Sequence, residues 1–236
     1  MLDSLLERVK RSDKLFTVYG RGDEADIERQ FEAHSVTVDW QQLPPDAPEP
    51  FVVVEEGGEF VGAIPLDELE WLLTPPVVRP ADPSQVAPGY RVLFEVLDET
   101  VFTAMNRRQL LAVSREIEDR ARRVGNGQLH ASFQHLSAFA EQVEWYWTLG
   151  EAGLDIHVYG APDWEPPEIP GVTFHGYGDE MLERYWVVTF DGGTEETQAC
   201  GLVGREYDGT FDGFWTDDPT LVTQIEGELV AEAGVD

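Results

Sequence analysis

The excess of carboxylates is the feature that most constrains how this chain can fold. It has 46 Asp and Glu against 16 Lys and Arg in 236 residues, a formal net charge of -30, and its only lysines are Lys10 and Lys14. Self-repulsion of this charge destabilises a compact state in dilute buffer, whereas molar salt, with a Debye length of about 3 Å, screens it. We therefore expect an acid-coated fold of the halophilic type, with an ordinary acidic mesophilic protein as the alternative.

The rest of the composition excludes several classes of protein. With 7 Trp, 7 Tyr and 12 Phe, and acids spread from Asp3 to Asp236, the chain is not a disordered acidic tail. A single cysteine, Cys200, cannot form an internal disulfide. The N-terminus lacks the apolar run of a signal peptide, and no window is long enough to span a membrane. We expect a cytoplasmic protein with no cofactor, no metal site and no direct nucleic-acid partner, since phosphate binding needs a basic surface.

The first half of the chain has the pattern of a small α/β unit. Its clearest signal is a β-hairpin, with strands over 51–55 and 59–64 and a Glu-Gly-Gly turn between them. The other expected elements are helices over 2–11, 25–33 and 66–73 and strands over 15–20 and 35–40. Residues 75–89 contain five prolines and no periodicity, which indicates a linker. We divide the chain into an N-terminal α/β subdomain (1–74), a Pro-rich linker with a connecting strand near 90–97 (75–97), and an α/β domain (98–236).

Two long helices are expected at the start of the second domain, over 98–124 and about 129–149, because each ends at a glycine signal. Strands are expected over 155–160, 172–175, 185–191, 198–206 and 209–215, and a last helix from an Asp-Asp-Pro cap to Glu228. The two halves share the order of FTVYG and IHVYG, VTVDW and GVTFHG, and FVVVEEGG and WVVTFDGG. We predict an α/β fold of mixed β-sheets flanked by helices, with two pseudo-repeated halves joined through the two long helices. Chance likeness of two ordinary α/β units is the alternative.

No catalytic motif is present, and the histidines give only a weak signal. There is no phosphate-binding loop, zinc-protease motif or nucleophile elbow in the sequence. His130 and His135, on the expected second helix, point in different directions. His157 and His175 lie on neighbouring expected strands and can approach one another, but a metal site would need a third ligand. Ordinary, partly buried histidines are the alternative.

Arginines gather on the first long helix. Six of the fourteen in the chain lie there: Arg107, Arg108, Arg115, Arg120, Arg122 and Arg123. The spacing also predicts the ion pairs Glu116–Arg120 and Glu118–Arg122. The helix is therefore either a solvated, salt-bridged face or a docking face for an acidic ligand or partner.

Aromatic residues mark two further candidate surfaces. Trp145, Tyr146 and Trp147 are consecutive in the expected second helix, so at least one of them should face a cleft or an interface. Residues 158–171 form a loop with four prolines and Trp164 at the carboxyl end of a strand, where α/β folds tend to build sites. A loop that only covers the core is the alternative.

The second domain resembles the DICT family of sensory domains. The resemblance is carried by HASFQHLSAFAEQVEWYWTLGEAGLDIHVYGAPDWEPPEIPGVTFHGYG, then YWVVTF, ACGLVGRE and FDGFWTDDPTLVTQI, and covers about 101–229. It is strongest at Phe133, Gln134, Leu136, Tyr159, Gly160, Pro162, Asp163, Trp164, Phe214, Trp215 and Pro219. The acidic composition and the run VFTAMNRRQLLAVSREIEDRA are similar to haloarchaeal members. The resemblance implies signal input and supplies no catalytic residue and no ligand.

From the resemblance and the candidate residues we expect a non-catalytic signal-input protein. It would regulate a signalling or transcription partner in trans, such as a kinase, a cyclase or a transcription regulator, and a homodimer is a further option. The alternative is a protein or enzyme that binds a small molecule, a metabolite or nucleotide, in a cleft near the VYGAPDW loop, and a third option is a purely structural oligomer. The candidate ligand- or partner-binding residues are Arg107, Arg108, Arg115, Trp145, Trp147, His157, Tyr159, Asp163, Trp164, His175 and Trp215.

Overall fold

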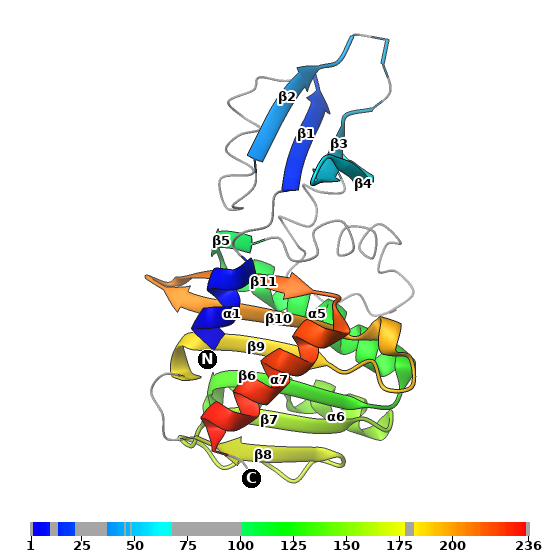
Figure 1. Ribbon diagram of the computed structural model, residues 1–236. Coiled ribbons are helices and arrows are strands. Elements are labelled where there is room, and N and C mark those ends of the chain that lie inside the picture. Colours follow the sequence, from blue (N-terminus) through cyan, green and yellow to red (C-terminus); the bar gives the residue numbers. More distant parts are fainter. Residues whose placement is uncertain are drawn as a thin grey trace.

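Two mixed β-sheets and the helices around them make up the described part of the chain (Figure 1). The computed structural model describes residues 2–9, 14–21, 37–44, 46–47, 49–67, 101–177 and 182–234. The expected α/β class with mixed sheets flanked by helices is confirmed. The expected helix over 25–33, most of the helix over 66–73, the proline-rich linker and the strand near 90–97 lie outside the described residues.

The small sheet comes from the N-terminal part of the chain. Its strands are β1 (Lys14–Gly20), β2 (Thr37–Gln42), β3 (Phe51–Glu56) and β4 (Glu59–Pro65). They lie in the order β2-β1-β3-β4, with β1 parallel to β2 and antiparallel to β3. The expected hairpin is confirmed as β3–β4, and its turn uses Gly57 and Gly58 at positive φ, a conformation that favours glycine.

The large sheet has seven strands in the order β5-β11-β10-β9-β6-β7-β8. They are β5 (Val101–Met105), β6 (Gln128–His135), β7 (Asp155–Ala161), β8 (Val172–Gly176), β9 (Tyr185–Phe190), β10 (Cys200–Tyr207) and β11 (Thr210–Thr216). Strands β6, β7 and β8 run parallel, whereas β9 is antiparallel to β6 and to β10. Strand β6 is thus the place where the parallel part of the sheet meets the antiparallel part.

Helices cover both faces of the large sheet, as Figure 1 shows. On one face lie α5 (Arg107–Val124) and α6 (Val143–Glu151), and on the other α1 (Leu2–Val9) and α7 (Pro219–Ala233). The alternation of a strand separates the two faces: Val188 of β9 packs with α5 and α6, and its neighbour Val187 packs with α1 and α7. No helix among the described residues is long and apolar enough to cross a membrane.

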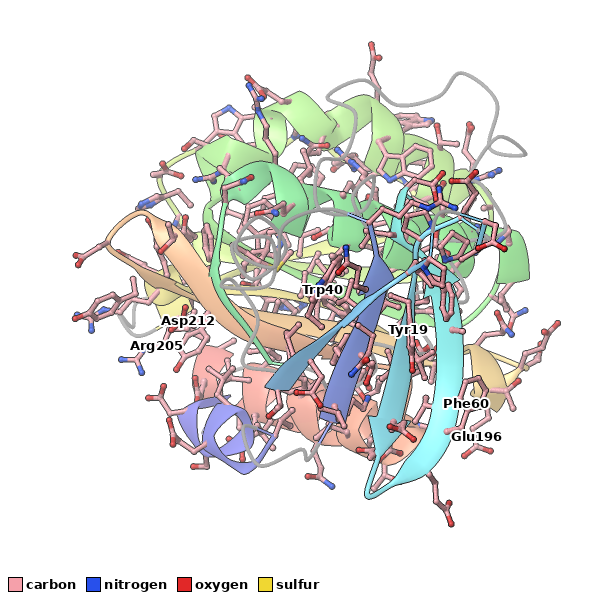
Figure 2. The ribbon with its side chains drawn as sticks, turned by 90° about the horizontal axis from the view of Figure 1, so that it is seen from above. Tyr19, Trp40, Phe60, Glu196, Arg205 and Asp212 are labelled. Carbon is pink, nitrogen blue, oxygen red and sulfur yellow. The ribbon has the colours of Figure 1, made fainter. Side chains whose placement is uncertain are left out.

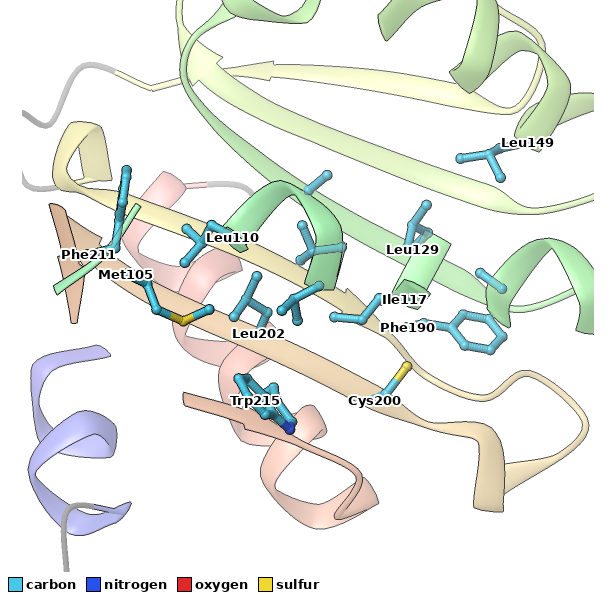
Figure 3. Packing of buried hydrophobic residues seen from close by; sticks show 14 of the residues in the cluster. Met105, Leu110, Ile117, Leu129, Leu149, Phe190, Cys200, Leu202, Phe211 and Trp215 are labelled. Atoms are coloured by element: carbon cyan, nitrogen blue, oxygen red, sulfur yellow. The ribbon is translucent and has the colours of Figure 1, made fainter. Parts of the chain in front are cut away.

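The main core lies between α5 and the sheet (Figure 3). Leu110 and Ile117 of α5 gather there with Leu202 of β10 and Leu129 of β6, all of them almost fully buried. Burying each such side chain contributes about 1.5–3 kcal/mol. A Cβ atom at Gly204 of β10 would lie 3.0 Å from Cδ2 of Leu110, so a larger residue there would press on α5.

The structure corrects the expected start of the first long helix. We expected a helix from residue 98, but 101–105 form strand β5, which pairs with β11. The sequence Val-Phe-Thr consists of residues that favour strands. Helix α5 begins only after Asn106, whose side chain accepts bonds from the backbone N–H groups of Arg108 and Gln109. This capping box fixes the helix start at Arg107.

The second long helix is also corrected. Residues 128–135, expected to be helical, form the central strand β6, and a 3-10 helix, η2 (Leu136–Gln142), connects it to the shorter helix α6. The alternation in β6 places Leu129 and Ala131 on the side of α5, while His130 faces the other side, where it contacts Tyr159. Residues 129–134, Leu-His-Ala-Ser-Phe-Gln, alternate apolar and polar as a strand does, and the polar His130 and Ser132 are buried as well as the apolar residues.

The two sheets share an order of strands that supports the predicted repeat. Strands β2, β1, β3 and β4 of the small sheet correspond in sequence to β8, β7, β9 and β10 of the large sheet. In both sets the first two strands are parallel and the last two are antiparallel. The large sheet differs in one respect, because β6 lies between β7 and β9, whereas β1 pairs directly with β3. The two sheets therefore share strand order and direction, the large sheet has β6 in addition, and a true repeat stays a prediction.

Helix α1 packs on the large sheet although it precedes the small one in sequence. Leu2 and Leu5 belong to the same buried cluster as Leu229 of α7. Asp3 accepts a hydrogen bond from the hydroxyl of Tyr185 at 2.5 Å and pairs with Arg205 at 2.8 Å. The division of the chain at 74–75 and 97–98 stays a prediction, because residues 68–100 are outside the described part.

Alanine substitutions at two helical glycines test how tightly α6 packs. Gly150 lies in α6, and Gly227 of α7 is the control. A Cβ atom at Gly150 would lie 1.8 Å from the carbonyl oxygen of Pro170, whereas at Gly227 nothing lies within 4 Å. We expect Gly150→Ala to lower the free energy of unfolding by about 1–3 kcal/mol, and Gly227→Ala to raise it by about 0.5–1 kcal/mol. Urea denaturation in about 1 M KCl measures both. Equal effects would show that α6 does not pack tightly on the loop of Pro170.

Candidate functional site

The main candidate site is a pocket at the carboxyl end of β6. Strand β6 pairs with β9 only from Leu129 to Ala131, and η2 begins a few residues later. A cavity of about 610 Å³ lies here, between α5, β6, η2, α6 and the start of β9. We call it the α5–β6 pocket, and it is lined by Arg107, Arg108, Leu111, Ser114, Arg115, Glu118, Ser132, Phe133, Gln134, Ser137, Ala138, Glu141, Gln142, Tyr146, Tyr185, Trp186 and Val188. Carboxyl ends of parallel strands, where the strand order changes, are the usual ligand sites of α/β sheets.

Three candidate residues from the sequence, Arg107, Arg108 and Arg115, meet in this pocket. Arg107 and Arg108 occupy the first turn of α5 and are exposed. The guanidinium carbon of Arg107 lies 5.4 Å from the centre of the Trp186 ring, a cation–π arrangement. Among the described residues no carboxylate forms an ion pair with Arg107 or Arg108. Within the described part of the chain, their guanidinium groups therefore have no carboxylate partner at the rim of the pocket.

Glu118 organises the floor of the pocket. Its carboxylate is almost fully buried, yet it accepts bonds from Nη1 of Arg115 at 2.6 Å, Nε1 of Trp145 at 2.8 Å and the hydroxyl of Tyr146 at 3.0 Å. Arg115 also donates to the side chain of Gln142. These bonds tie α5 to α6 and η2. A buried carboxylate with three donors is well satisfied, so it holds both helices in one arrangement.

Arg115 differs from the two arginines at the rim. Burial alone would lower its pKa, but the charge and hydrogen bond of Glu118 outweigh the burial and raise the pKa of Arg115 above its ordinary value. Its charge is thus neutralised inside the protein. Arg115 acts as part of the wall, while Arg107 and Arg108 remain the cationic groups available to a bound molecule.

The role of Glu118 is tested by Glu118→Gln, which keeps the shape of the side chain and removes its charge. We expect the free energy of unfolding to fall by roughly 1–3 kcal/mol, because Arg115 loses its buried counter-charge. Glu144→Gln on the exposed face of α6 is the control and should change it by less than about 0.5 kcal/mol. Urea denaturation measures both variants. Equal stability of the two would contradict a structural role for the Glu118 contacts.

The ion pairs on α5 differ from those expected. Glu118 pairs with Arg115 instead of Arg122, which pairs with Asp119 at 3.6 Å. Arg123 pairs with Glu116 at 3.0 Å, and Arg120 reaches out of the helix to Asp217 at 2.8 Å. Most of these side chains are buried or half-buried, because α5 packs with its apolar stripe on the sheet. The helix is therefore a salt-bridged packing element, and its exposed arginines are those at its two ends.

The three consecutive aromatics of α6 take three different roles. Tyr146 is fully buried and Trp145 is half-buried with its Nε1 on Glu118. Trp147 is 41% exposed, and its Nε1 donates to Glu151 at 3.1 Å. Trp147 also borders a shallow hollow of about 570 Å³ with the prolines of the 166–170 loop. Trp147 is therefore the aromatic residue of the three that faces outward.

The residues of the VYGAPDW segment (158–164) do not line the α5–β6 pocket. Tyr159 is 1% exposed, on the opposite face of the sheet from the α5–β6 pocket. Asp163 accepts bonds from the backbone N–H of Ser137 at 2.9 Å and from its hydroxyl at 2.6 Å, and these bonds lower the pKa of Asp163. Trp164 packs on the main core, and Trp215 is buried within it (Figure 3). Asp163 thus holds η2, beside the pocket, while both tryptophans pack the fold.

The histidines predicted to approach one another do so. Nδ1 of His157 lies 2.9 Å from Nε2 of His175, on the face of the sheet that α7 covers. His130, which belongs to β6 and not to a helix, stacks on His157 with ring centres 4.8 Å apart, and its Nδ1 lies 3.0 Å from the hydroxyl of Tyr159. Each ring contact joins neighbouring strands. We call His130, His157, His175 and Tyr159 the histidine cluster.

The surroundings of the histidine cluster disfavour protonation of His130 and His175. Burial, followed by the charges that His157 and His175 can carry, lowers the pKa of His130 to about 4. Burial and then His157 also lower the pKa of His175. Burial and the charge of Glu226 on α7 raise the pKa of Tyr159 to about 12. In the described residues no three or more metal-ligating side chains come close enough to hold an ion.

Glu226 gives the pH dependence that the structure predicts. Burial, reinforced by the charge of Asp191 and opposed by the hydroxyl of Thr189, raises the pKa of Glu226 from 4.5 to about 7. The folded state therefore holds this proton more tightly than the unfolded state. The stability that results is present below pH 4.5 and is lost as the pH rises through about 7.

We expect the free energy of unfolding of the wild type, relative to Glu226→Gln, to fall by roughly 1–3 kcal/mol between about pH 4.5 and pH 8. The contribution of His130 to stability changes with pH in the opposite direction, since it is present above pH 6.5 and is lost as the pH falls through about 4. Because both proteins contain His130, the difference between them isolates Glu226. Urea denaturation at several pH values gives this difference, and a constant difference would contradict the burial of the carboxyl group.

Several residues of the pocket were not among the sequence candidates. Trp186 donates from Nε1 to the hydroxyl of Ser114 at 2.8 Å, and that hydroxyl donates to the carbonyl of Leu110. Gln134 donates to Glu206. Of these residues only Trp186 could have been singled out from the sequence, since the Nε1 group of a tryptophan at the start of a buried strand needs a hydrogen-bond partner. Ser114 and Gln134 carry no such signal, because only the tertiary structure places them at the pocket.

Comparison with known proteins gives one family. Residues 91–206 match the family DICT, described as the sensory domain in diguanylate cyclases and two-component system. No curated protein matches the sequence. Among solved structures the chain is similar to polyphosphate kinase from Porphyromonas gingivalis, with 12% identity and a TM-score of 0.39. That likeness covers 97% of this chain and 47% of the kinase, and with so low a TM-score it carries no argument.

Proposed function

Because the chain belongs to the DICT family of sensory domains through residues 91–206, we propose that it is a non-catalytic signal-input protein. In this proposal a small molecule binds in the α5–β6 pocket, and the bound state changes how the protein interacts with a signalling partner in trans. The observation that carries the proposal is the pocket itself, because every residue that lines it lies within the family segment.

The position of the pocket supports a sensory role. It is bordered by the first turns of α5, by η2 and by α6, three elements that are joined through Glu118 and through the bond of Arg115 to Gln142. A ligand that contacts α5 and η2 together favours the arrangement in which both are in place. Binding can shift a conformational equilibrium only through such a difference in affinity between two states.

The chemistry of the described lining supports binding more than catalysis. Ser114, Gln134 and Ser137 have hydroxyl or amide groups that are already engaged in hydrogen bonds. A nucleophile would need an adjacent general base, and the described lining residues include neither a histidine nor a cysteine. We therefore assign the pocket to recognition, and the partner to the output of the signal.

The partner that we propose is a cytoplasmic signalling protein, such as a kinase, a cyclase or a transcription regulator. A chain of net charge -30 disfavours direct contact with nucleic acid. Trp147 is the exposed aromatic next to the pocket helices and is the first residue to examine at the partner surface. A homodimer of this chain is the competing assembly, and its mass in molar KCl distinguishes the two.

Two alanines of η2 provide the test of this function. Ala138 lines the pocket and Ala140 does not, although both are exposed on the same 3-10 helix. We expect Ala138→Trp to fill the pocket and to change the amount of signalling protein that co-purifies with the tagged chain by about threefold or more. Ala140→Trp should leave that amount unchanged. Quantitative mass spectrometry of proteins recovered in about 1 M KCl measures both.

The proposal fails if the same partner is recovered in equal amounts with both variants, because its recovery would then not depend on the pocket. It also fails if no kinase, cyclase or regulator is recovered in a stoichiometric amount. Circular dichroism of both variants checks that each is folded.

A further inference from the structure

The geometry points to a ligand class for the α5–β6 pocket: an organic anion with an apolar body, whose carboxylate or phosphate head is bound by Arg107 and Arg108. This inference deepens the proposed function and rests on it. It assigns the head of the ligand to the rim of the pocket and the body to its interior.

The charge distribution supports an anionic head. In a protein of net charge -30, the described residues that line the pocket include three arginines and only two acids, Glu118 and Glu141. Glu118 is engaged by Arg115. Arg107 and Arg108 therefore present two guanidinium groups that no described carboxylate neutralises. Guanidinium groups match carboxylate and phosphate with paired hydrogen bonds.

The position of these two arginines in α5 also has a cost that a bound anion would remove. They occupy the first turn of the helix, which contains no acidic residue. The helix dipole is positive at this end, so each cation there is unfavourable by about 0.3–1 kcal/mol at low ionic strength. An anion held between them would be attracted by both the arginines and the dipole. Local placements that oppose stability are expected at functional sites.

The interior of the pocket is suited to an apolar body. Its side-chain walls include Leu111, Phe133, Trp186 and Val188. The polar groups behind these walls are already bonded to one another, as in the contacts of Ser114 with Trp186 and of Tyr146 with Glu118. A polar body would leave its own donors and acceptors without partners there, at a cost of about 1–3 kcal/mol each. An apolar body has no donors or acceptors to satisfy, so it does not incur this cost.

The size of the cavity limits the ligand. A volume of about 610 Å³ is within the range of small-molecule sites and accepts a body of one or two rings. Arg107 already lies over the face of Trp186, so a planar body can take a position against the same aromatic wall. The inferred ligand is thus an amphipathic acid of the size of a naphthyl acid.

Matched probes test the inference. 2-Naphthylacetate and 2-naphthyl phosphate combine the aromatic body with the two kinds of anionic head, 2-naphthylacetamide lacks the charge, and inorganic phosphate lacks the body. Isothermal titration calorimetry in about 1 M KCl gives their affinities. We expect one of the two naphthyl anions to bind at least about tenfold more tightly than the amide and than inorganic phosphate, and the tighter of the two identifies the head.

Variants assign the binding to the pocket. Arg107→Gln and Arg108→Gln should each weaken binding of the anion by about tenfold and leave the amide unchanged. Arg205→Gln is the control, because Arg205 lies on β10 beside α1 (Figure 2), does not line the pocket, and its pair with Asp3 is half-exposed. The affinity of Arg205→Gln for the naphthyl anion should stay within about twofold of that of the wild type. Ala138→Trp should abolish binding of every naphthyl probe.

The outcomes separate this inference from the proposed function. Equal affinity for the acids and the amide, with both lost in Ala138→Trp, overturns the anionic head and leaves the pocket as the sensory site. No binding of either naphthyl anion at about 10 mM overturns the inferred ligand class. Binding that Ala138→Trp does not change places the ligand elsewhere and overturns both. Tighter binding of inorganic phosphate than of the naphthyl anions overturns the apolar body.

Discussion

The position of β6 between β7 and β9 is the constraint on which the rest of the structure depends. This strand is parallel to β7 and antiparallel to β9, and its pairing with β9 lasts for only three residues. The two elements that flank it in sequence, α5 before and α6 after, both pack on one face of the sheet. A pocket at the end of β6 follows from this arrangement, because α5 and η2 must diverge there to reach their own places on the sheet. Glu118, at the floor of this pocket, holds α5 and α6 together.

The pocket lies beside the strand by which the large sheet differs from the small one. The small sheet has the strand order and directions of β8, β7, β9 and β10, but β1 pairs with β3 without an intervening strand. Without a counterpart of β6, the described small sheet has no strand end at which a helix pair could separate. The family segment, 91–206, contains β6 and the whole lining of the pocket. The proposed binding site and β6 thus lie in the same part of the chain.

Strongly acidic surfaces and a cationic pocket rim are compatible because they act over different distances. The repulsion among surface carboxylates extends over many ångströms and is screened by salt, whereas contacts between a guanidinium and an anion in a pocket are screened much less. The surface charge can therefore serve solubility at high salt while Arg107 and Arg108 still bind an anion. Figure 2 shows how widely the charged side chains, such as Glu196, Arg205 and Asp212, are spread over the described surface.

The sequence predicted those features that depend on neighbours in the chain. Alternating apolar residues and turn glycines were sufficient for β1, the β3–β4 hairpin and β7 to β11, and the clustering of arginines led to Arg107, Arg108 and Arg115. Strand β6 was missed although residues 129–134 alternate apolar and polar, because the glycine signal after α6 indicated the end of one continuous helix. Strand β5 was missed because its residues precede a helix without a break in the pattern. Trp186 and Ser114 could not be connected with α5 before the fold was known, since their contact joins residues 72 positions apart. The histidine cluster was half foreseen, because His157 and His175 were placed on adjacent strands but His130 was assigned to a helix.

The central claim is that the α5–β6 pocket is where this protein recognises its ligand. A crystal structure of the full chain grown with 2-naphthylacetate at high KCl tests the claim most directly. The account predicts electron density for the aromatic body beside Phe133 and Trp186, with the carboxylate within hydrogen-bond distance of Arg107 or Arg108. Density for the probe at another surface, with Trp186 and Phe133 closing the empty pocket, would contradict it.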